Sequence, residues 1–163
     1  MTQSILSDFR AISNKVKSFE FYQSEALNRD RCPDLNIAFE AMYQNLKTEV
    51  ADAQYFGSID LCLRIKGTGK DSDQEALSIL LIINGLFSAD EKAFTAEMFE
   101  EMVCINGIVV LLHQARSFIS ATTALAGITP PILMPMVNVY ELNRAMQGVD
   151  TDMETQTKET KEL

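Results

Sequence analysis

The chain has 163 residues, 47% hydrophobic and 23% charged, which is typical of one ordinary globular domain and excludes a fibrous or wholly disordered protein. Fourteen Lys and Arg against 23 Asp and Glu give a formal net charge of -9, so a nucleic-acid partner is not expected. The cysteines Cys32, Cys62 and Cys104 form no C-x-x-C pair, and no basic and apolar leader opens the chain, which together predict a reducing, cytoplasmic compartment.

The first two elements show apolar side chains at helical spacing. In residues 5–19 these side chains are three or four positions apart, and the same holds in residues 35–53. The two stripes are Ile5, Phe9, Ile12, Val16 and Phe19, followed by Leu35, Phe39, Met42, Leu46, Val50 and Ala53. Because this spacing places each stripe on one face of a helix, we expect two amphipathic helices joined by a polar turn.

The pattern changes between Gly57 and Gly67, where apolar and polar residues alternate strictly. The apolar positions are Ile59, Leu61, Leu63 and Ile65. Alternation is typical of a half-buried strand. No second clear alternating run is present to pair with it, so an extension of the preceding helix remains an equal alternative.

Two capping-box spacings then indicate helix starts. Ser72 and Glu75 precede the apolar run 76–83, which we expect to form a central core helix because it is apolar on nearly all sides. Ser88 and Glu91 precede the longest apolar pattern, from Phe94 to Ile119.

The end of this long helix is predicted at Gly127, because Pro130 and Pro131 follow it directly. A last helix is expected over 131–147. The expected fold is therefore all-α: a single-domain helical bundle of about five helices over 1–148, with at most one short strand near 58–66. Residues 149–163 are too polar to bury a core, and we expect them to form a flexible acidic tail.

Acidic pairs offer the strongest case for an enzyme. Glu49 and Asp52 lie three positions apart, as do Glu97 and Glu100 with Glu101 beside them. Their spacing resembles the helix-borne Mg²⁺ ligands of all-α nucleotide pyrophosphatases, although the E-x-x-E pair precedes the E-x-x-D pair in that family and follows it here. A Mg²⁺-dependent hydrolase is thus an alternative hypothesis. Acidic spacings of this kind also arise by chance on solvated helix faces, so no catalytic, cofactor or metal residue is predicted.

The stretch Ser117–Tyr140 contains no ionisable side chain except the terminal phenol. Gly127 and three prolines interrupt it, which disfavours a single membrane span and leaves a membrane-active helical component as a second alternative. Burial in a core or at a protein interface is favoured. The candidate interaction residues are Ile119, Leu125, Ile128, Ile132, Leu133, Met136, Val139 and Tyr140.

The main functional hypothesis is accordingly a non-enzymatic interaction or assembly protein. It covers an adaptor, a secretion-type chaperone, an inhibitor, or a subunit of a larger complex, including one of phage or viral origin. The expected partners are other proteins, and self-association stays open.

Overall fold

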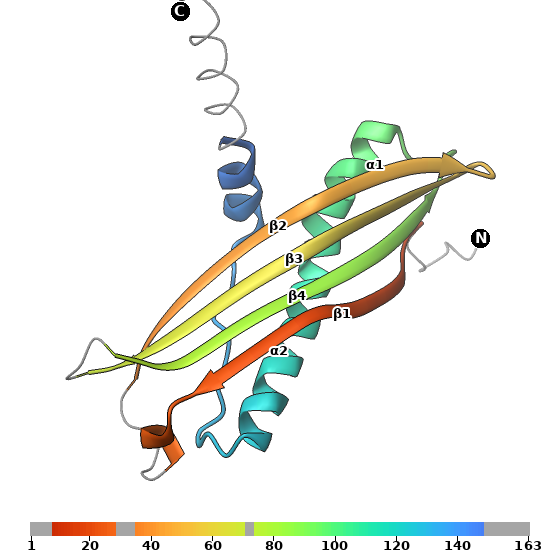
Figure 1. Cartoon of the computed structure of the whole chain (residues 1–163). Coiled ribbons are helices and arrows are strands. Elements are labelled where there is room, and N and C mark those ends of the chain that lie inside the picture. The colour runs from red at the N-terminus through yellow and green to blue at the C-terminus, as the bar shows by residue number, and fades with distance from the viewer. Residues whose placement is uncertain (1–7, 29–34, 71–73, 149–163) are drawn as a thin grey trace, which may run out of the picture.

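The computed structural model describes residues 8–28, 35–70 and 74–148. Four long antiparallel strands form one sheet in the order β1-β4-β3-β2 (Figure 1). The strands are β1 (Phe9–Gln23), β2 (Leu35–Ala51), β3 (Gln54–Gly69) and β4 (Glu75–Asp90). The predicted all-α bundle is therefore wrong, because most of the regular structure in the described residues is antiparallel sheet.

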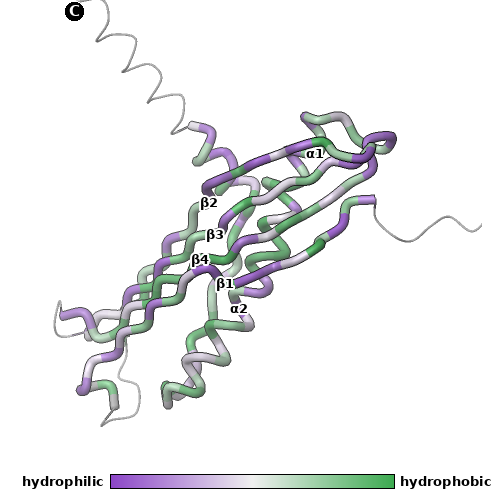
Figure 2. The backbone as a smooth tube through the Cα atoms, turned by 45° about the vertical axis from the view of Figure 1, so that its right-hand side comes forward, coloured by the Kyte–Doolittle hydropathy of each residue, from purple (hydrophilic) through white to green (hydrophobic). Residues whose placement is uncertain are grey.

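The helical part follows the sheet and covers one of its faces. It consists of α1 (Ala96–Met102), the π-helical turn η2 (Val103–Gly107) and α2 (Ile108–Leu125), which run on as one helix. A short 3-10 turn, η1 (Glu25–Asn28), follows β1, and residues 139–148 are also helical. Figures 1 and 2 show the chain after α2 returning alongside it on the same face of the sheet.

The long helix was predicted from its spacing, but it starts later than expected. Its first turn is capped by Thr95, whose hydroxyl accepts a hydrogen bond from the Met98 amide at 3.2 Å. Ser88 belongs to β4 instead. The last predicted helix, 131–147, is helical only from residue 139. Ser72 of the first capping box and the tail 149–163 lie outside the described residues.

The expected helix over 5–19 is β1 in its described part, and two bulges explain the error. Ile12 and Lys17 are extra residues in the pairing with β4, so the side chains on the inner, helix-covered face are alternately two and three positions apart. These inner residues are Phe9, Ala11, Asn14, Val16, Phe19 and Phe21. The irregular spacing imitates that of a helix.

The expected helix over 35–53 is β2 and the hairpin that follows. Met42, chosen for its helical spacing, pairs with Cys62 on the outer face of the sheet and is 47% exposed. The two-residue turn Asp52-Ala53 has positive φ at both residues, 51° and 59°, as a tight hairpin requires. Because Ala53 replaces the glycine that usually marks such a turn, the sequence gives little sign of the hairpin.

The run 76–83, predicted as a core helix, lies in β4, an interior strand of the sheet. Its inner positions are completely buried, and its outer positions Leu80 and Ile82 are half-buried. An interior strand that is apolar on both faces gives a continuous hydrophobic run, and periodicity alone does not separate such a run from a buried helix. The alternating run 59–65 is indeed a strand, in the middle of β3.

The core lies between the inner face of the sheet and the continuous helix. Phe87 and Phe99 are both fully buried there. Gly57 permits this close packing, because a Cβ atom at that position would lie 2.8 Å from Val103 and 2.9 Å from Phe99. The sheet and the helix therefore form a two-layer domain, and the outer face of the sheet bears no helix among the described residues.

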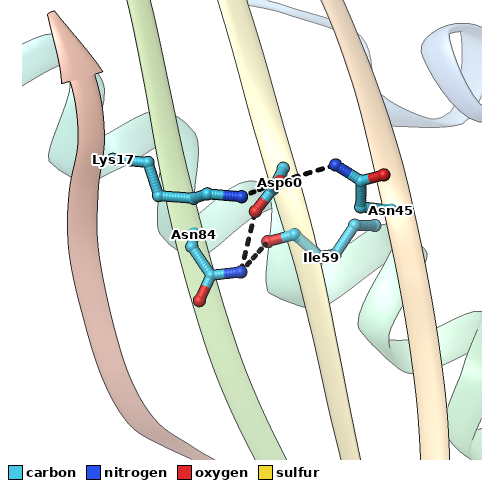
Figure 3. Close-up of polar contacts among 5 residues, drawn as sticks. All are labelled: Lys17, Asn45, Ile59, Asp60 and Asn84. Carbon is cyan, nitrogen blue, oxygen red and sulfur yellow. Dashed lines mark hydrogen bonds and ion pairs between the residues drawn. The ribbon is translucent and has the colours of Figure 1, made fainter.

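A polar cluster on the outer face joins all four strands (Figure 3). Asp60 of β3 is 1% exposed and accepts three hydrogen bonds: from Lys17 at 2.7 Å, from Asn45 at 2.8 Å and from Asn84 at 2.7 Å. Lys17 and Asn45 both lie at irregularities in the edge strands β1 and β2. The cluster thus fixes the registers of both edge strands against the sheet centre.

The environment of Asp60 also sets its ionisation. Burial alone would raise the pKa of its carboxyl group. The hydrogen bonds from Lys17, Asn45 and Asn84, together with the positive charge of Lys17, outweigh burial and hold the pKa below its ordinary value. Asp60 is therefore a carboxylate at neutral pH, as three donors require.

Candidate functional site

The helix α2 ends in a left-handed glycine that turns the chain back along the helix. Gly127 has φ of 82°, and the Ile128 amide donates to the Thr123 carbonyl at 3.0 Å. The following residues, 128–138, form neither helix nor strand. We call these residues the strap.

The strap is fastened to α2 by polar contacts at two places. The Ile132 amide donates to the Thr123 hydroxyl at 3.0 Å, and the Arg116 guanidinium donates to the Pro135 carbonyl at 3.2 Å. Thr123 is fully buried, and its hydroxyl donates in turn to the Ile119 carbonyl at 2.8 Å. The strap therefore runs antiparallel to α2 over about two helical turns.

The helical residues 139–148 connect the end of the strap to β2. Asn138 caps this helix, because its side-chain oxygen accepts from the amides of Tyr140 at 3.2 Å and Glu141 at 3.3 Å. The Tyr43 hydroxyl of β2 donates to the Asn143 side chain at 2.5 Å. The strap thus starts at α2 and ends beside an edge strand of the sheet.

Large apolar side chains point away from the protein around the strap. Leu125 is 89% exposed, Leu133 74%, Met136 84% and Tyr140 67%. We call these four residues the apolar surface. They lie within the stretch that carries no charged side chain, so no charge interrupts their chain segment. Strongly exposed apolar side chains on one uncharged segment make this segment a candidate for contact with another molecule.

The eight predicted interaction residues divide according to the direction of their side chains. Ile119, Ile128 and Val139 are buried in the core, and Ile132 is half-buried against it. The other four form the apolar surface. The role of these eight residues in an interaction stays a prediction. Sequence reasoning could not separate inward from outward positions, because an irregular segment has no fixed period.

Three residues that position the strap were missed. Thr123 and Arg116 hold it directly, and Tyr43 holds the helix after it. Thr123 lies one helical turn after Ile119 on the buried face of α2, so a polar residue at a core position was an available signal. Tyr43 gave none, because its partner is 100 residues away in the sequence.

The acidic pairs do not form a metal site in the described residues. Glu49 lies in β2 and Asp52 in the hairpin turn, so they are not neighbours on a helix. No group of three or more His, Cys, Asp and Glu side chains within 8–28, 35–70 and 74–148 is arranged to hold a metal ion. The arrangement expected for a hydrolase is thus not found in the part of the chain that the structure describes.

A cavity of about 390 Å³ lies between α1 and the helical residues 139–148. Its lining residues are Glu97, Glu100, Glu101, Cys104, Asn143 and Gln147. Burial raises the pKa of the Cys104 thiol most, a hydrogen bond with Tyr43 lowers it, and the charges of Glu100 and Glu101 raise it further. A thiol with a raised pKa is protonated at neutral pH and is a poor nucleophile.

The continuous helix Ala96–Leu125 is the one described segment that is long and apolar enough to cross a membrane, by length and composition only. Within its most apolar window, 44% of the residues are buried inside the protein. The uncharged stretch 117–140 does not form one helix, because α2 ends at Leu125.

The comparison with solved structures finds a protein with a similar fold. A SecB-like chaperone of Mycobacterium tuberculosis, solved in complex with a ChAD peptide from the HigA1 antitoxin, superposes with a TM-score of 0.52 and 13% identity, over 80% of this chain and 91% of that chain. A protein of unknown function from Streptococcus agalactiae gives a TM-score of 0.41 and 14% identity, over 78% of this chain and 97% of that one. The chain matches no protein-family model and no curated protein. The first similarity shows a SecB-like fold.

Proposed function

We propose that the chain binds apolar segments of other polypeptides without covalent chemistry, as a chaperone or adaptor does. The observation that carries this proposal is the apolar surface, four large side chains exposed on a stretch without charge. Water is excluded from such side chains when a partner covers them, and this supplies binding free energy of about 25 cal/mol per Å² buried.

Two further observations support the proposal. The SecB-like chaperone that shares the fold was solved with a peptide of another protein. The stretch 117–140 contains no Asp or Glu, so no carboxylate of this stretch opposes an apolar ligand. The partner class proposed is thus an unfolded or extended polypeptide with exposed apolar side chains.

The double substitution Leu133→Glu and Met136→Glu should weaken binding of an unfolded polypeptide by at least about tenfold, because two carboxylates would have to be desolvated in an apolar contact. The probe is a fluorescent polypeptide kept unfolded by reduction and carboxymethylation, and the readout is fluorescence anisotropy. Light scattering on the same samples measures whether the free protein self-associates through this surface.

Met42→Glu is the matched control, since Met42 is half-exposed on the opposite face of the sheet. This variant should bind the unfolded polypeptide as the wild type does. Equal weakening in the control would place the contact on the outer face. Absence of binding by the wild type would contradict the proposed function.

A further inference from the structure

The strap covers the part of the sheet's inner face that α2 leaves free. On one side, the Phe118 ring of α2 contacts the Phe19 ring of β1 edge-on, with the ring centroids 5.0 Å apart. On the other side, the chain after the strap is bonded to β2 through Tyr43 and Asn143. Figures 1 and 2 show the strap alongside α2 in this position. An extended segment of the chain thus fills the space between α2 and the β2 side of the sheet.

Apolar side chains hold the strap in this groove. Ile128 is 4% exposed, Met134 5% and Val139, the residue directly after the strap, 7%. These three side chains belong to the same buried cluster as the inner residues of β3 and β4. The groove therefore accepts branched and methionine side chains from an extended, uncharged chain.

Few backbone hydrogen bonds fasten the strap. The described residues give three between it and α2: from Ile128, from Ile132 and to the Pro135 carbonyl. Its three prolines have no amide hydrogen to donate. A paired strand of equal length would form a regular ladder, so the strap is held mainly by its side chains.

Each end of the strap lies at a break in the regular structure. Gly127 adopts a left-handed conformation, and no atom lies within 4 Å of the position that a Cβ would take there. At the other end, the cap at Asn138 makes the residues from 139 onward a separate helix. Rotation about these two points would displace the strap and would leave the hydrogen bonds within α2 and the sheet in place.

We propose that the strap is an internal substitute for the ligand: it fills the groove into which an extended, uncharged apolar segment of a partner polypeptide binds after the strap has moved out. This inference rests on the proposed function and adds a second contact, the groove beneath the strap, to the apolar surface. The segments that fit the groove carry isoleucine, valine or methionine side chains, and they can contain proline because few backbone hydrogen bonds are needed there. Only molecules with an open strap bind the partner. The apparent affinity is therefore the affinity of the open form multiplied by the fraction of open molecules.

A peptide with the sequence of residues 128–139, extended by two lysines and labelled with fluorescein, tests the proposal by fluorescence anisotropy. The double variant Thr123→Val and Arg116→Met removes both side chains that bond to the strap and keeps its apolar anchors. We expect this variant to bind the peptide about tenfold more tightly than the wild type, because a larger fraction of its grooves is open. Hydrogen exchange at the amides of Leu133, Met134 and Met136 should also be faster.

Ser117→Ala is the matched control, since the Ser117 hydroxyl bonds to the His113 carbonyl within α2 and not to the strap. It should bind the peptide as the wild type does. Equal peptide affinity in the double variant and the wild type would overturn the proposal, and so would unchanged exchange of the strap amides, because the two bonds would then not hold the strap closed.

The unfolded polypeptide described above separates this proposal from the proposed function. If the strap proposal alone fails, the wild type still binds that polypeptide and the double variant binds it equally. If the proposed function fails, neither protein binds it.

Discussion

Substitution of Phe87 by alanine should lower the free energy of unfolding by about 3–5 kcal/mol, the loss expected for a large aromatic side chain removed from a packed core. Phe87 is fully buried, and its ring stacks on that of Phe9 with the centroids 5.3 Å apart. It also fills the space above two glycines, since added Cβ atoms at Gly85 and Gly107 would lie 2.6 Å and 3.0 Å from its ring. The glycines at these two positions have no side chain that could fill the cavity.

Urea unfolding measures this loss, and Phe56→Ala is the control. Phe56 is half-buried on the outer face of the sheet, where no helix of the described chain covers it. Its loss should be less than half of that for Phe87. Similar losses in both variants would contradict a core located between the inner face and the helix.

Asp60→Asn should lower the free energy of unfolding at pH 7 by about 2–3 kcal/mol, because the amide group presents a donor to side chains that require an acceptor. Loss of one partner of a fully buried ion pair costs about 3–5 kcal/mol. The smaller value applies here since the Lys17 side chain is 44% exposed and regains water. Asn45 and Asn84 remain as the incompletely satisfied groups.

The pH dependence of stability gives an independent check on this cluster. The folded pKa of Asp60 is lowered, so its stabilisation is fully present above the unfolded value of about 3.9 and is lost as the pH falls through the folded pKa. Urea unfolding from pH 7 to pH 2 should therefore show a steeper acid decline for the wild type than for Asp60→Asn. Parallel declines would mean that Asp60 does not titrate against the cluster.

The sequence indicated one strand, as one of two equal alternatives, and predicted the long helix, because each follows a regular period. β3 alternates without interruption over 59–65, and the helix keeps a spacing of three and four over 94–119. β1 and β2 contain register shifts that break their alternation. A sheet also depends on pairing between distant segments, and local patterns do not contain that information.

The candidate site was predicted only in part, for a related reason. Absence of charge over 117–140 is a local property, and it identified the stretch that carries the apolar surface. Which side chains of the strap point outward depends on its contacts with Arg116 and Thr123, and these follow from the turn at Gly127. The contacts and the turn both belong to the tertiary structure, so a local sequence pattern does not show them.

Photo-crosslinking tests most directly whether the apolar surface contacts a bound polypeptide. A photoreactive amino acid replaces Leu133 on the apolar surface in one variant and Met42 on the outer face of the sheet in another, and each is irradiated with the carboxymethylated unfolded polypeptide. We predict a crosslinked product from position 133 and only background from position 42. A product from position 42 with none from position 133 would contradict binding at the apolar surface.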